Sequence, residues 1–461
     1  MASLVKRCWA TGFSLLRRNF AERKLGAQMT MMMSTGVNSS PSSRIISPWL
    51  MLPQEGGGDM VYKFYNLSEK KEESFPRNSE VELTDAKLVG SSHGYLALFN
   101  QRDNNHLFLY NPITRRHIKL PPIETLPDPR INLTPDGRGS VSKLILSSSP
   151  DDDNDECIAM MTFGPGDRLA FCHPCRSSTE WTPIGKLYFE VDEESFDEDY
   201  RNPLLNIGMN YGRAYEDFVY CRRLKRFTCI TQFEIDLVSS CFCHPVCELE
   251  DWDLSDPHSP ISATCSLGLV SLLFGGQEWM TQNLSLLKKC RQIPYLIFAE
   301  EHNQLFILIR FVMDRVAPDG SYVHIDESLF DPISWRLLVD TYPYKTVGFC
   351  VLNVDYHRKD RKKGVNHVRL LKDGSLCGLT MFVGMNHSFA VSSADFPNLK
   401  PNSIYFTDAN KHGNSIYGGQ DIGIFDFANK TLSPCDCYPC VDIPSMNKIA
   451  PPPMWFTPSL Y

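Results

Sequence analysis

The chain has 461 residues, of which 43% are hydrophobic, so it is long and apolar enough for a large buried core. Residues 1–24 carry six basic side chains and one acidic side chain, and the rest of the chain, with 40 basic and 53 acidic residues, has a formal charge of −13. This acidic body argues against general nucleic-acid binding, and the absence of any run of 18 apolar residues argues against a membrane span.

Residues 1–24 are predicted to form an amphipathic helix that directs the protein to an organelle. Four apolar side chains recur at spacings of four, three and four residues, which places them on one helix face. They are Trp9, Phe13, Leu16 and Phe20. An arginine-rich, acid-poor helix at the extreme N-terminus is typical of a transit peptide. The alternative is a basic surface helix of a cytosolic protein.

The composition of this helix favours the mitochondrion over the chloroplast, because its arginine content exceeds its content of serine and threonine. The run from Arg18 to Ala21 also resembles a mitochondrial processing site, with the arginine two residues before Phe20 and cleavage before Ala21. Residues 25–59 follow, are rich in methionine, serine and glycine, and have no periodicity. They are predicted to be a disordered, flexible linker.

Residues 60–461 show a different pattern, in which short apolar or alternating runs are separated by glycine, proline, asparagine and aspartate. The runs have the length of strands and are rich in valine, isoleucine, phenylalanine and tyrosine, whereas helical windows are scarce. Many strands and few helices predict a sandwich, a barrel or a propeller, and the length of the pattern favours the propeller. We therefore predict one all-β, β-propeller-like domain over residues 60–461.

Strands are predicted along the whole of this domain. In chain order they are Gly94–Phe99, Leu107–Tyr110, Cys157–Phe163, Arg168–Cys172, Lys186–Val191, Ala214–Cys221, Phe227–Leu237, Gly268–Phe274, Tyr295–Glu300, Gln304–Val312, Thr346–Leu352, Gly378–Val383, Ser403–Thr407 and Gly423–Asp426. Two hairpins are expected, one joining the first two of these strands and one joining Gln304–Val312 to Tyr322–Asp326. Short helical turns are expected at Gln282–Cys290 and Ser392–Asn398.

Two stretches carry a distinctive order of motifs. Lys87 to Pro122 contains the turn Gly90-Ser-Ser-His-Gly94 and a second turn at Asn111-Pro112. Phe382 to Asp408 is followed by DIGIFDF, by Leu-Ser-Pro and by the tail PPPMWFTPSL. With these motifs the chain resembles, from about Pro48 onward, the plant domain of unknown function two hundred and ninety-five family, the KIB-type β-propeller associated with F-box proteins. The resemblance implies a propeller fold, a plant origin and no known activity.

Most members of that family carry an F-box before the propeller, which docks the adaptor of ubiquitin ligases. Residues 1–60 hold no F-box pattern and carry the basic helix and the linker instead. The resemblance therefore implies an organellar branch of the family, in which a transit peptide replaces the F-box. The alternative is a substrate receptor of a ubiquitin ligase whose F-box is lost or degenerate.

The run Gly90-x-Ser92-x-Gly94 matches the letters of the serine-hydrolase elbow. That elbow connects a strand to a helix, whereas Tyr95–Phe99 has the pattern of a second strand. We therefore interpret the run as a turn between strands.

Sixteen cysteines include three clusters that could hold zinc. They are Cys172 with Cys175, then Cys241, Cys243, His244 and Cys247, and finally Cys435, Cys437 and Cys440. The spacings differ between clusters, so no pairing is forced. We favour buried free thiols in a reducing compartment.

Two charged runs are interpreted as solvated loops. Asp151–Glu156 lacks the glycine and the terminal glutamate of a calcium loop, and His357–Lys363 has a single flanking aromatic residue to stack on RNA. We assign no catalytic, cofactor-binding or metal-binding residue and expect no cofactor.

The sequence thus predicts a non-enzymatic interaction protein of the mitochondrion, in which loops on one face of a rigid β-scaffold bind a protein partner. It identifies neither the partner nor the oligomeric state. Besides the ubiquitin-ligase receptor, a second alternative is an enzyme with its site in the central channel of the propeller.

Overall fold

A computed structural model describes most of the chain between Ser47 and Ser459. The described ranges are 47–53, 61–76, 86–100, 106–126, 141–152, 156–164, 168–176, 178–185, 215–231, 248–268, 278–314, 316–317, 321–323, 343–360, 365–371, 374–408, 420–435, 449 and 452–459. The predicted transit peptide (1–24) and residues 25–46 of the predicted linker lie outside the described residues.

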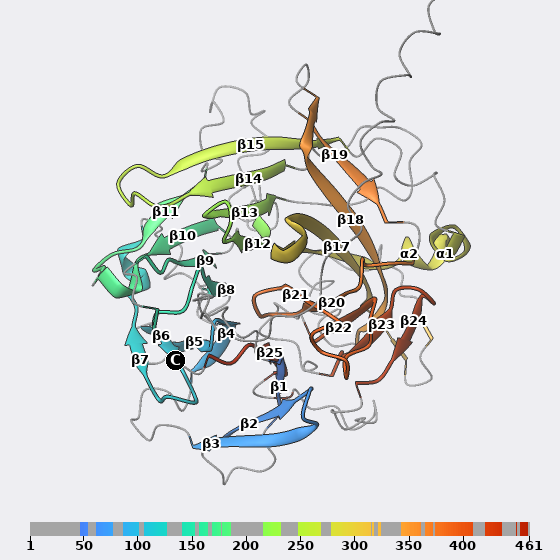
Figure 1. Cartoon of the computed structure of the whole chain (residues 1–461), viewed down its shortest axis with the longest axis horizontal. Helices are drawn as coiled ribbons and strands as arrows, with labels where there is room; N and C mark the ends of the chain where they lie inside the picture. The colour runs from blue at the N-terminus through green and yellow to red at the C-terminus, as the bar shows by residue number, and fades with distance from the viewer. Residues whose placement is uncertain are drawn as a thin grey trace, which may run out of the picture. The chain divides into compact units, whose positions relative to one another are not determined.

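Sheets of four or five strands form six blades around a common axis (Figure 1). An eight-stranded sheet contains two of these blades, β12–β15 and β16–β19, because β15 pairs with β19 over a short parallel stretch. The helices in the described part are short, namely α1 (Glu278–Gln282) and α2 (Leu284–Leu287), together with brief 3-10 turns. The prediction of an all-β, propeller-like domain is therefore confirmed.

The first three blades contain the N-terminal strands and the last strand of the chain. Blade 1 holds, in sheet order, β25 (Met454–Phe456), β1 (Trp49–Met51), β2 (Val61–Asn66) and β3 (Lys71–Pro76). Blade 2 holds β4 (Lys87–Ser92), β5 (Tyr95–Asn100), β6 (His106–Tyr110) and β7 (His117–Lys119). Blade 3 holds β8 (Val141–Leu146), β9 (Ala159–Phe163), β10 (Arg168–Cys172) and β11 (Thr182–Ile184).

The second half of the propeller follows the same plan. Blade 4 holds β12 (Tyr215–Cys221), β13 (Arg226–Thr231), β14 (Glu248–Asp253) and β15 (Ile261–Gly268). Blade 5 holds β16 (Arg291–Ala299), β17 (Gln304–Met313), β18 (Lys345–Asp360) and β19 (Val365–Leu370). Blade 6 holds β21 (Phe389–Ser392), β20 (Leu379–Val383), β22 (Ser403–Phe406), β23 (Gly423–Asp426) and β24 (Thr431–Ser433).

One strand of each blade lies next to the axis and meets its counterpart in a neighbouring blade. Contacts of this kind join β25 to β4, β4 to β8, β12 to β16 and β16 to β21. The approach is especially close at Gly90 of β4, where a Cβ atom would lie 2.0 Å from the carbonyl oxygen of Leu144 in β8. A glycine is therefore needed where the inner strands of blades 2 and 3 converge.

The last strand of the propeller completes its first blade. β25 pairs antiparallel with β1, and Trp49, Leu50 and Met51 face Phe456, Trp455 and Met454 in register. β1 lies inside the range 25–59 that the sequence assigns to the linker, so the propeller includes residues before 60.

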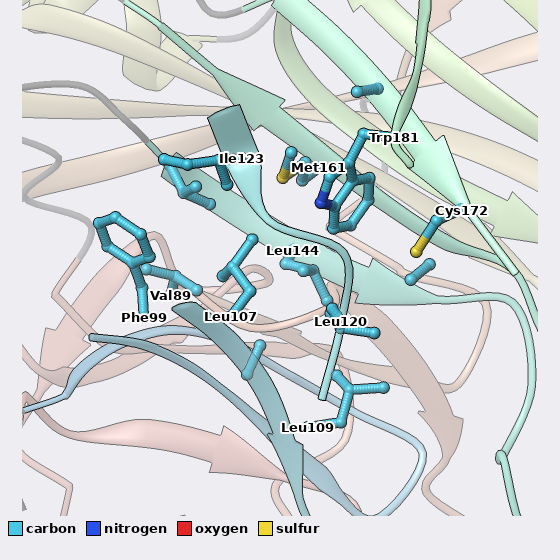
Figure 2. Close-up of a cluster of buried hydrophobic side chains, with 14 of the residues drawn as sticks. Val89, Phe99, Leu107, Leu109, Leu120, Ile123, Leu144, Met161, Cys172 and Trp181 are labelled. Atoms are coloured by element: carbon cyan, nitrogen blue, oxygen red, sulfur yellow. The ribbon is translucent and has the colours of Figure 1, made fainter. Parts of the chain in front are cut away.

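The blades are held together by buried apolar clusters between them, and Figure 2 shows the cluster between blades 2 and 3. Val89 and Leu107 of blade 2 lie near Leu144 of blade 3, and all three are fully buried or nearly so. The Trp181 indole Nε1–H donates to the carbonyl oxygen of Pro121 at 2.7 Å, so this buried polar atom has a partner. Each such fully buried large side chain stabilises the fold by about 1.5–3 kcal/mol.

Most predicted strands on described residues are confirmed, as is the hairpin of β5 with β6. The hairpin expected between Gln304–Val312 and Tyr322–Asp326 is wrong, because β17 pairs with β16 and β18 on its two sides and Tyr322 only bridges to Val316. The helical turn expected at Ser392–Asn398 is also wrong, since that segment ends β21 and continues as turns. Lys186–Val191 and residues 269–274 lie outside the described residues.

None of the helices in the described ranges is long and apolar enough to cross a membrane.

Candidate functional site

The turn between β4 and β5 is the first element of the site. His93 and Gly94 both have left-handed backbone angles, with φ of 50° and 80°, as a two-residue hairpin requires. The Ser92 hydroxyl accepts a hydrogen bond from the Leu146 backbone N–H at 3.1 Å and so ties blade 2 to blade 3. The Gly-x-Ser-x-Gly run therefore ends β4 and turns into β5, so it connects two strands, as predicted, and lacks the strand-to-helix context of a hydrolase elbow.

A loop of blade 6 forms the second element. Residues 384–388 connect β20 to β21, and the backbone N–H of His387 donates to the carbonyl oxygen of Ser91 at 2.9 Å. Blade 1 lies between blades 6 and 2 in the ring, so the loop reaches past one blade to contact the next (Figure 1).

Two imidazoles and a guanidinium meet where these elements converge. The rings of His93 and His387 are 5.7 Å apart between centroids. Nη2 of Arg222, in the turn after β12, lies 3.2 Å from Nδ1 of His93. The backbone N–H of Arg222 donates to Oε1 of Glu300 at 2.7 Å, in the turn after β16. Residues of blades 2, 4, 5 and 6 are thus linked at one end of the axis.

Burial, together with nearby positive charges, keeps both imidazoles neutral at pH 7. Burial and then the charge of Arg222 lower the pKa of His93 to about 3, against an opposing effect of the Leu146 backbone. Burial, His93, Lys143 and Arg222 also lower the pKa of His387 well below its usual value. Both side chains remain partly accessible, as expected of groups that face the axis.

Several buried polar atoms on these two elements have no hydrogen-bond partner in the described part of the chain. They are Ser91 Oγ, His93 Nε2, Asn386 Oδ1, His387 Nε2 and Ser388 Oγ. Ser91, Asn386 and Ser388 are 3%, 0% and 1% exposed. A buried polar group without a partner costs about 1–3 kcal/mol, so a group of them indicates a place where something polar binds. We call these residues, together with Arg222, the axial cluster.

A buried ion pair supports the axial cluster from the side of blades 3 and 4. Nζ of Lys143 in β8 lies 2.5 Å from Oδ1 of Asp217 in β12, and the side chains are 7% and 3% exposed. The second carboxylate oxygen of Asp217 accepts from the Leu296 backbone N–H in β16 at 2.8 Å. One carboxylate thus joins three inner strands.

A second buried ion pair joins blade 5 to blade 6. Arg310 of β17 is 1% exposed, and its Nη2 donates to Oδ2 of Asp421 at 2.8 Å. The same guanidinium donates through Nη1 to the Thr407 carbonyl oxygen at 2.7 Å and through Nε to the Thr346 hydroxyl at 2.7 Å. These contacts are all internal to the protein, so we assign this pair to structure.

The cysteines that the sequence singled out do not converge in the described ranges. Cys172 packs in the core between blades 2 and 3 (Figure 2), and burial raises its thiol pKa well above the usual value. Cys435 is buried in another apolar cluster. Among the described residues no group of three or more His, Cys, Asp or Glu side chains could hold a metal ion. Cys241, Cys243, His244, Cys247, Cys437 and Cys440 lie outside them.

The charged runs are only partly described. Asp151 is not a solvated loop residue, because it accepts a hydrogen bond from the Tyr95 hydroxyl at 2.9 Å and pairs with Arg116. Glu156 is exposed and lies 3.7 Å from Lys225. The side chains of the run 357–363 lie outside the described residues.

Comparison with known proteins identifies the family of the chain. The family model described as "KIB1-4 beta-propeller" matches residues 64–426. The chain belongs to the KIB1-4 β-propeller family. This is a β-propeller family without a known catalytic function. No curated protein matches the chain.

Three solved structures similar to this chain have low scores. The β-propeller domain of Cps50 (Swd1) from Myceliophteria thermophila is 10% identical, with 70% of this chain and 89% of that one covered and a TM-score of 0.29. Hsv2 from Kluyvelomyces marxianus is 9% identical, with coverages of 68% and 90% and a TM-score of 0.21. An N-acetylgalactosamine deacetylase from F. plautii, in complex with blood group B trisaccharide, is 10% identical, with coverages of 90% and 88% and a TM-score of 0.23. At these scores they carry no argument about function.

Proposed function

We propose that this KIB1-4 β-propeller is a non-enzymatic interaction protein that binds an acidic segment of a protein partner. The binding face is the one on which the axial cluster lies, at the turns after β4, β12 and β16. Loops at one end of a rigid β-scaffold are common recognition sites, and a propeller offers such loops from every blade.

The turn between β12 and β13 carries this proposal. Residues 222–226 read Arg-Arg-Leu-Lys-Arg and all five are exposed, whereas the body of the chain has a formal charge of −13. Leu224 is 44% exposed at the centre of the basic turn, which is an unusual place for a large apolar side chain. A basic turn with one apolar side chain fits an acidic segment that carries an apolar residue, because opposite charges steer the encounter and the apolar contact adds affinity.

The axial cluster does not fit an acid–base enzyme. A general base works best with a pKa near the operating pH, and the pKa of both imidazoles is far below 7. In the described part of the chain no carboxylate contacts His93 or His387 to orient either ring, and the neighbouring Ser92 hydroxyl is bonded to Leu146. These observations support a binding role.

We further propose that the protein works in the mitochondrion of a plant, in an organellar branch of its family without an F-box. The Arg-rich, acid-poor helix predicted for residues 1–24 supports the mitochondrial location. The chloroplast is the alternative organelle. A ubiquitin-ligase receptor in the cytosol or nucleus is the alternative function, and it would require an adaptor-binding segment.

Localisation is tested with the full chain and with a chain that lacks residues 1–24, each fused at its C-terminus to a fluorescent protein. We expect the full chain in mitochondria and the shortened chain in the cytosol. Localisation of both chains in the cytosol or nucleus, together with co-purification of a ubiquitin-ligase adaptor, would favour the receptor instead.

The binding face is tested by photo-crosslinking in the compartment where the full chain resides. A photoreactive residue replaces Leu224 in one protein and, as the matched control, Ile261 in another; Ile261 is 65% exposed on the outer strand of the same blade. We expect a defined crosslinked protein from position 224, lost when Arg223 and Lys225 are changed to glutamate, and none from position 261. Equal crosslinking from both positions would contradict the proposed face.

A further inference from the structure

We propose that the axial cluster is an oxyanion-binding site, which takes a carboxylate or phosphate group between His93, His387 and Arg222. The inference deepens the proposed function, because a carboxylate of the acidic partner is one source of that group. The anion site is tested with free anions. It can therefore fail while the protein-binding role holds, and the protein-binding role can fail while the anion site holds.

The tautomer of His93 is the first step. A guanidinium is always charged and only donates hydrogen bonds. Because Nη2 of Arg222 lies 3.2 Å from Nδ1 of His93, Nδ1 must be the acceptor and the ring proton must sit on Nε2. Nε2–H is therefore a donor, and it makes no well-aligned hydrogen bond in the described structure, although the Leu146 backbone lies close enough to act on the ring. A donor without an acceptor favours an oxygen ligand.

The charge balance is the second step. Arg222 and Lys143 both lie close enough to lower the pKa of His387, and Arg222 does the same for His93. The nearby carboxylates are otherwise engaged: Asp217 pairs with Lys143 and accepts from the Leu296 N–H, and Glu300 accepts from the Arg222 backbone N–H. Lys143 and Asp217 neutralise each other, so the guanidinium of Arg222 is the charged group in contact with His93, and no acidic group among the described residues contacts either imidazole.

The remaining buried donors are the third step. Ser91 and Ser388 carry hydroxyl groups that are nearly inaccessible and have no partner among the described residues, on the two segments joined by the hydrogen bond from His387 to Ser91. Hydroxyl and neutral imidazole N–H groups satisfy the several lone pairs of an oxyanion. The ring centroids are 5.7 Å apart, so a group of a few atoms can contact both rings.

A metal ion fits the same residues poorly. Binding a metal at Nε2 of His93 would require the proton to move to Nδ1, where it would face the guanidinium of Arg222. The positive charge of Arg222 also opposes a cation. An anion avoids both costs.

The test uses the full chain and two anions, inorganic phosphate and acetate, against chloride at equal ionic strength. Thermal melting and the ¹⁵N-histidine NMR spectrum are recorded during each titration at pH 7. We expect a saturable rise of Tm with phosphate or acetate, and a shift of the Nε2–H signals of His93 and His387. Chloride gives no saturable change.

The matched variants are Arg222→Gln and Arg115→Gln, which remove equal charge from exposed positions; Arg115 lies in the turn between β6 and β7, outside the axial cluster and the basic turn. Arg222→Gln removes the guanidinium that holds the proton of His93 on Nε2, together with the nearest positive charge, so it should raise the apparent Kd about tenfold or more, whereas Arg115→Gln should raise it by less than about twofold. A third variant, His93→Gln, should also weaken binding.

Three outcomes overturn the proposal. They are an equal effect of Arg222→Gln and Arg115→Gln, no saturable response to either anion, and a saturable response to Zn²⁺ that His93→Gln removes. Comparison of free acetate with a short acidic peptide then separates the sources of the group. A peptide that binds through Arg222 more tightly than acetate assigns the site to the partner, and equal affinity assigns it to a free anion.

Discussion

The backbone N–H of His387 donates to the carbonyl oxygen of Ser91 at 2.9 Å, so a loop of the sixth blade is fixed on the second. This contact brings together two imidazoles that are separated by nearly 300 residues in the chain. Because the loop also lies within reach of the charges of Lys143 and Arg222, four blades determine the electrostatics of one small region.

Acid should destabilise the protein through His93 and His387. Both have a folded-state pKa below the unfolded value near 6.5, so the unfolded chain binds protons that the folded chain rejects. The contribution of each ring is fully present above pH 6.5 and is lost as the pH falls toward its folded pKa, by up to about 1.4 kcal/mol per pH unit.

The measurement is urea unfolding between pH 7.5 and pH 4.5. His93→Gln and His387→Gln should each flatten the loss of stability in that window, whereas the exposed residue His258 provides the control His258→Gln, with the wild-type slope. The charged residues around the two rings, Arg222, Lys143, Asp217 and Glu300, are not substituted in these variants. A wild-type slope in both axial variants would contradict the assignment.

Gly90→Ala should destabilise the fold strongly. The new Cβ would lie 2.0 Å from the Leu144 carbonyl oxygen, so the inner strands of blades 2 and 3 would have to separate, at about 1–3 kcal/mol or more. Gly378→Ala is the control, because its φ of +77° is unfavourable for alanine but nothing lies within 4 Å of the new Cβ. We expect a loss of about 1 kcal/mol there, and thermal and urea unfolding compare the two.

Lys143→Met should cost about 3–5 kcal/mol, because it leaves the Asp217 carboxylate buried without its countercharge, although the Leu296 N–H still donates to it. Lys143→Met combined with Asp217→Asn should recover part of this loss, since the buried charge is then gone. Urea unfolding of the two single variants and the double variant measures the coupling. Additive effects would show that the pair does not act as a unit.

Arg310→Met should likewise cost about 3–5 kcal/mol, because Asp421 and the Thr407 carbonyl oxygen lose their charged donor. The Asp421 carboxylate keeps its bonds from the N–H and hydroxyl of Thr346. The loss should appear in unfolding experiments while the photo-crosslink from position 224 remains, since this pair lies outside the axial cluster. Loss of the crosslink in a folded Arg310→Met protein would show that the two regions are coupled.

The strands and the fold class could be predicted from sequence, because each strand is short, apolar and bounded by turn residues. Asn111 shows why this works: its side-chain oxygen accepts from the N–H groups of Ile113 and Thr114, so a local hydrogen bond ends β6 where the sequence predicts it. The strand with which each strand pairs was harder to predict from the sequence. β17 is central in its blade, and the pairing with β18 across residues 314–344 leaves no local signal.

The axial cluster could not be predicted in this way. His93, Arg222 and His387 each belong to a different blade, so no motif along the chain joins them. Two local signals exist, namely the basic run of residues 222–226 and the turn His93-Gly94 at the end of an inner strand, but neither points to the other. Only the closed ring brings the three side chains together.

The pairing of β25 with β1 sets the order in which the protein can fold. These strands are about 400 residues apart, so the ring stays open until nearly the whole chain is available. During synthesis, one edge of β1 is without its partner and exposes backbone groups that can pair with other chains. Blade 1 is thus both the first sheet to emerge and the last to be finished, and the interval between the two is when the protein most needs a chaperone.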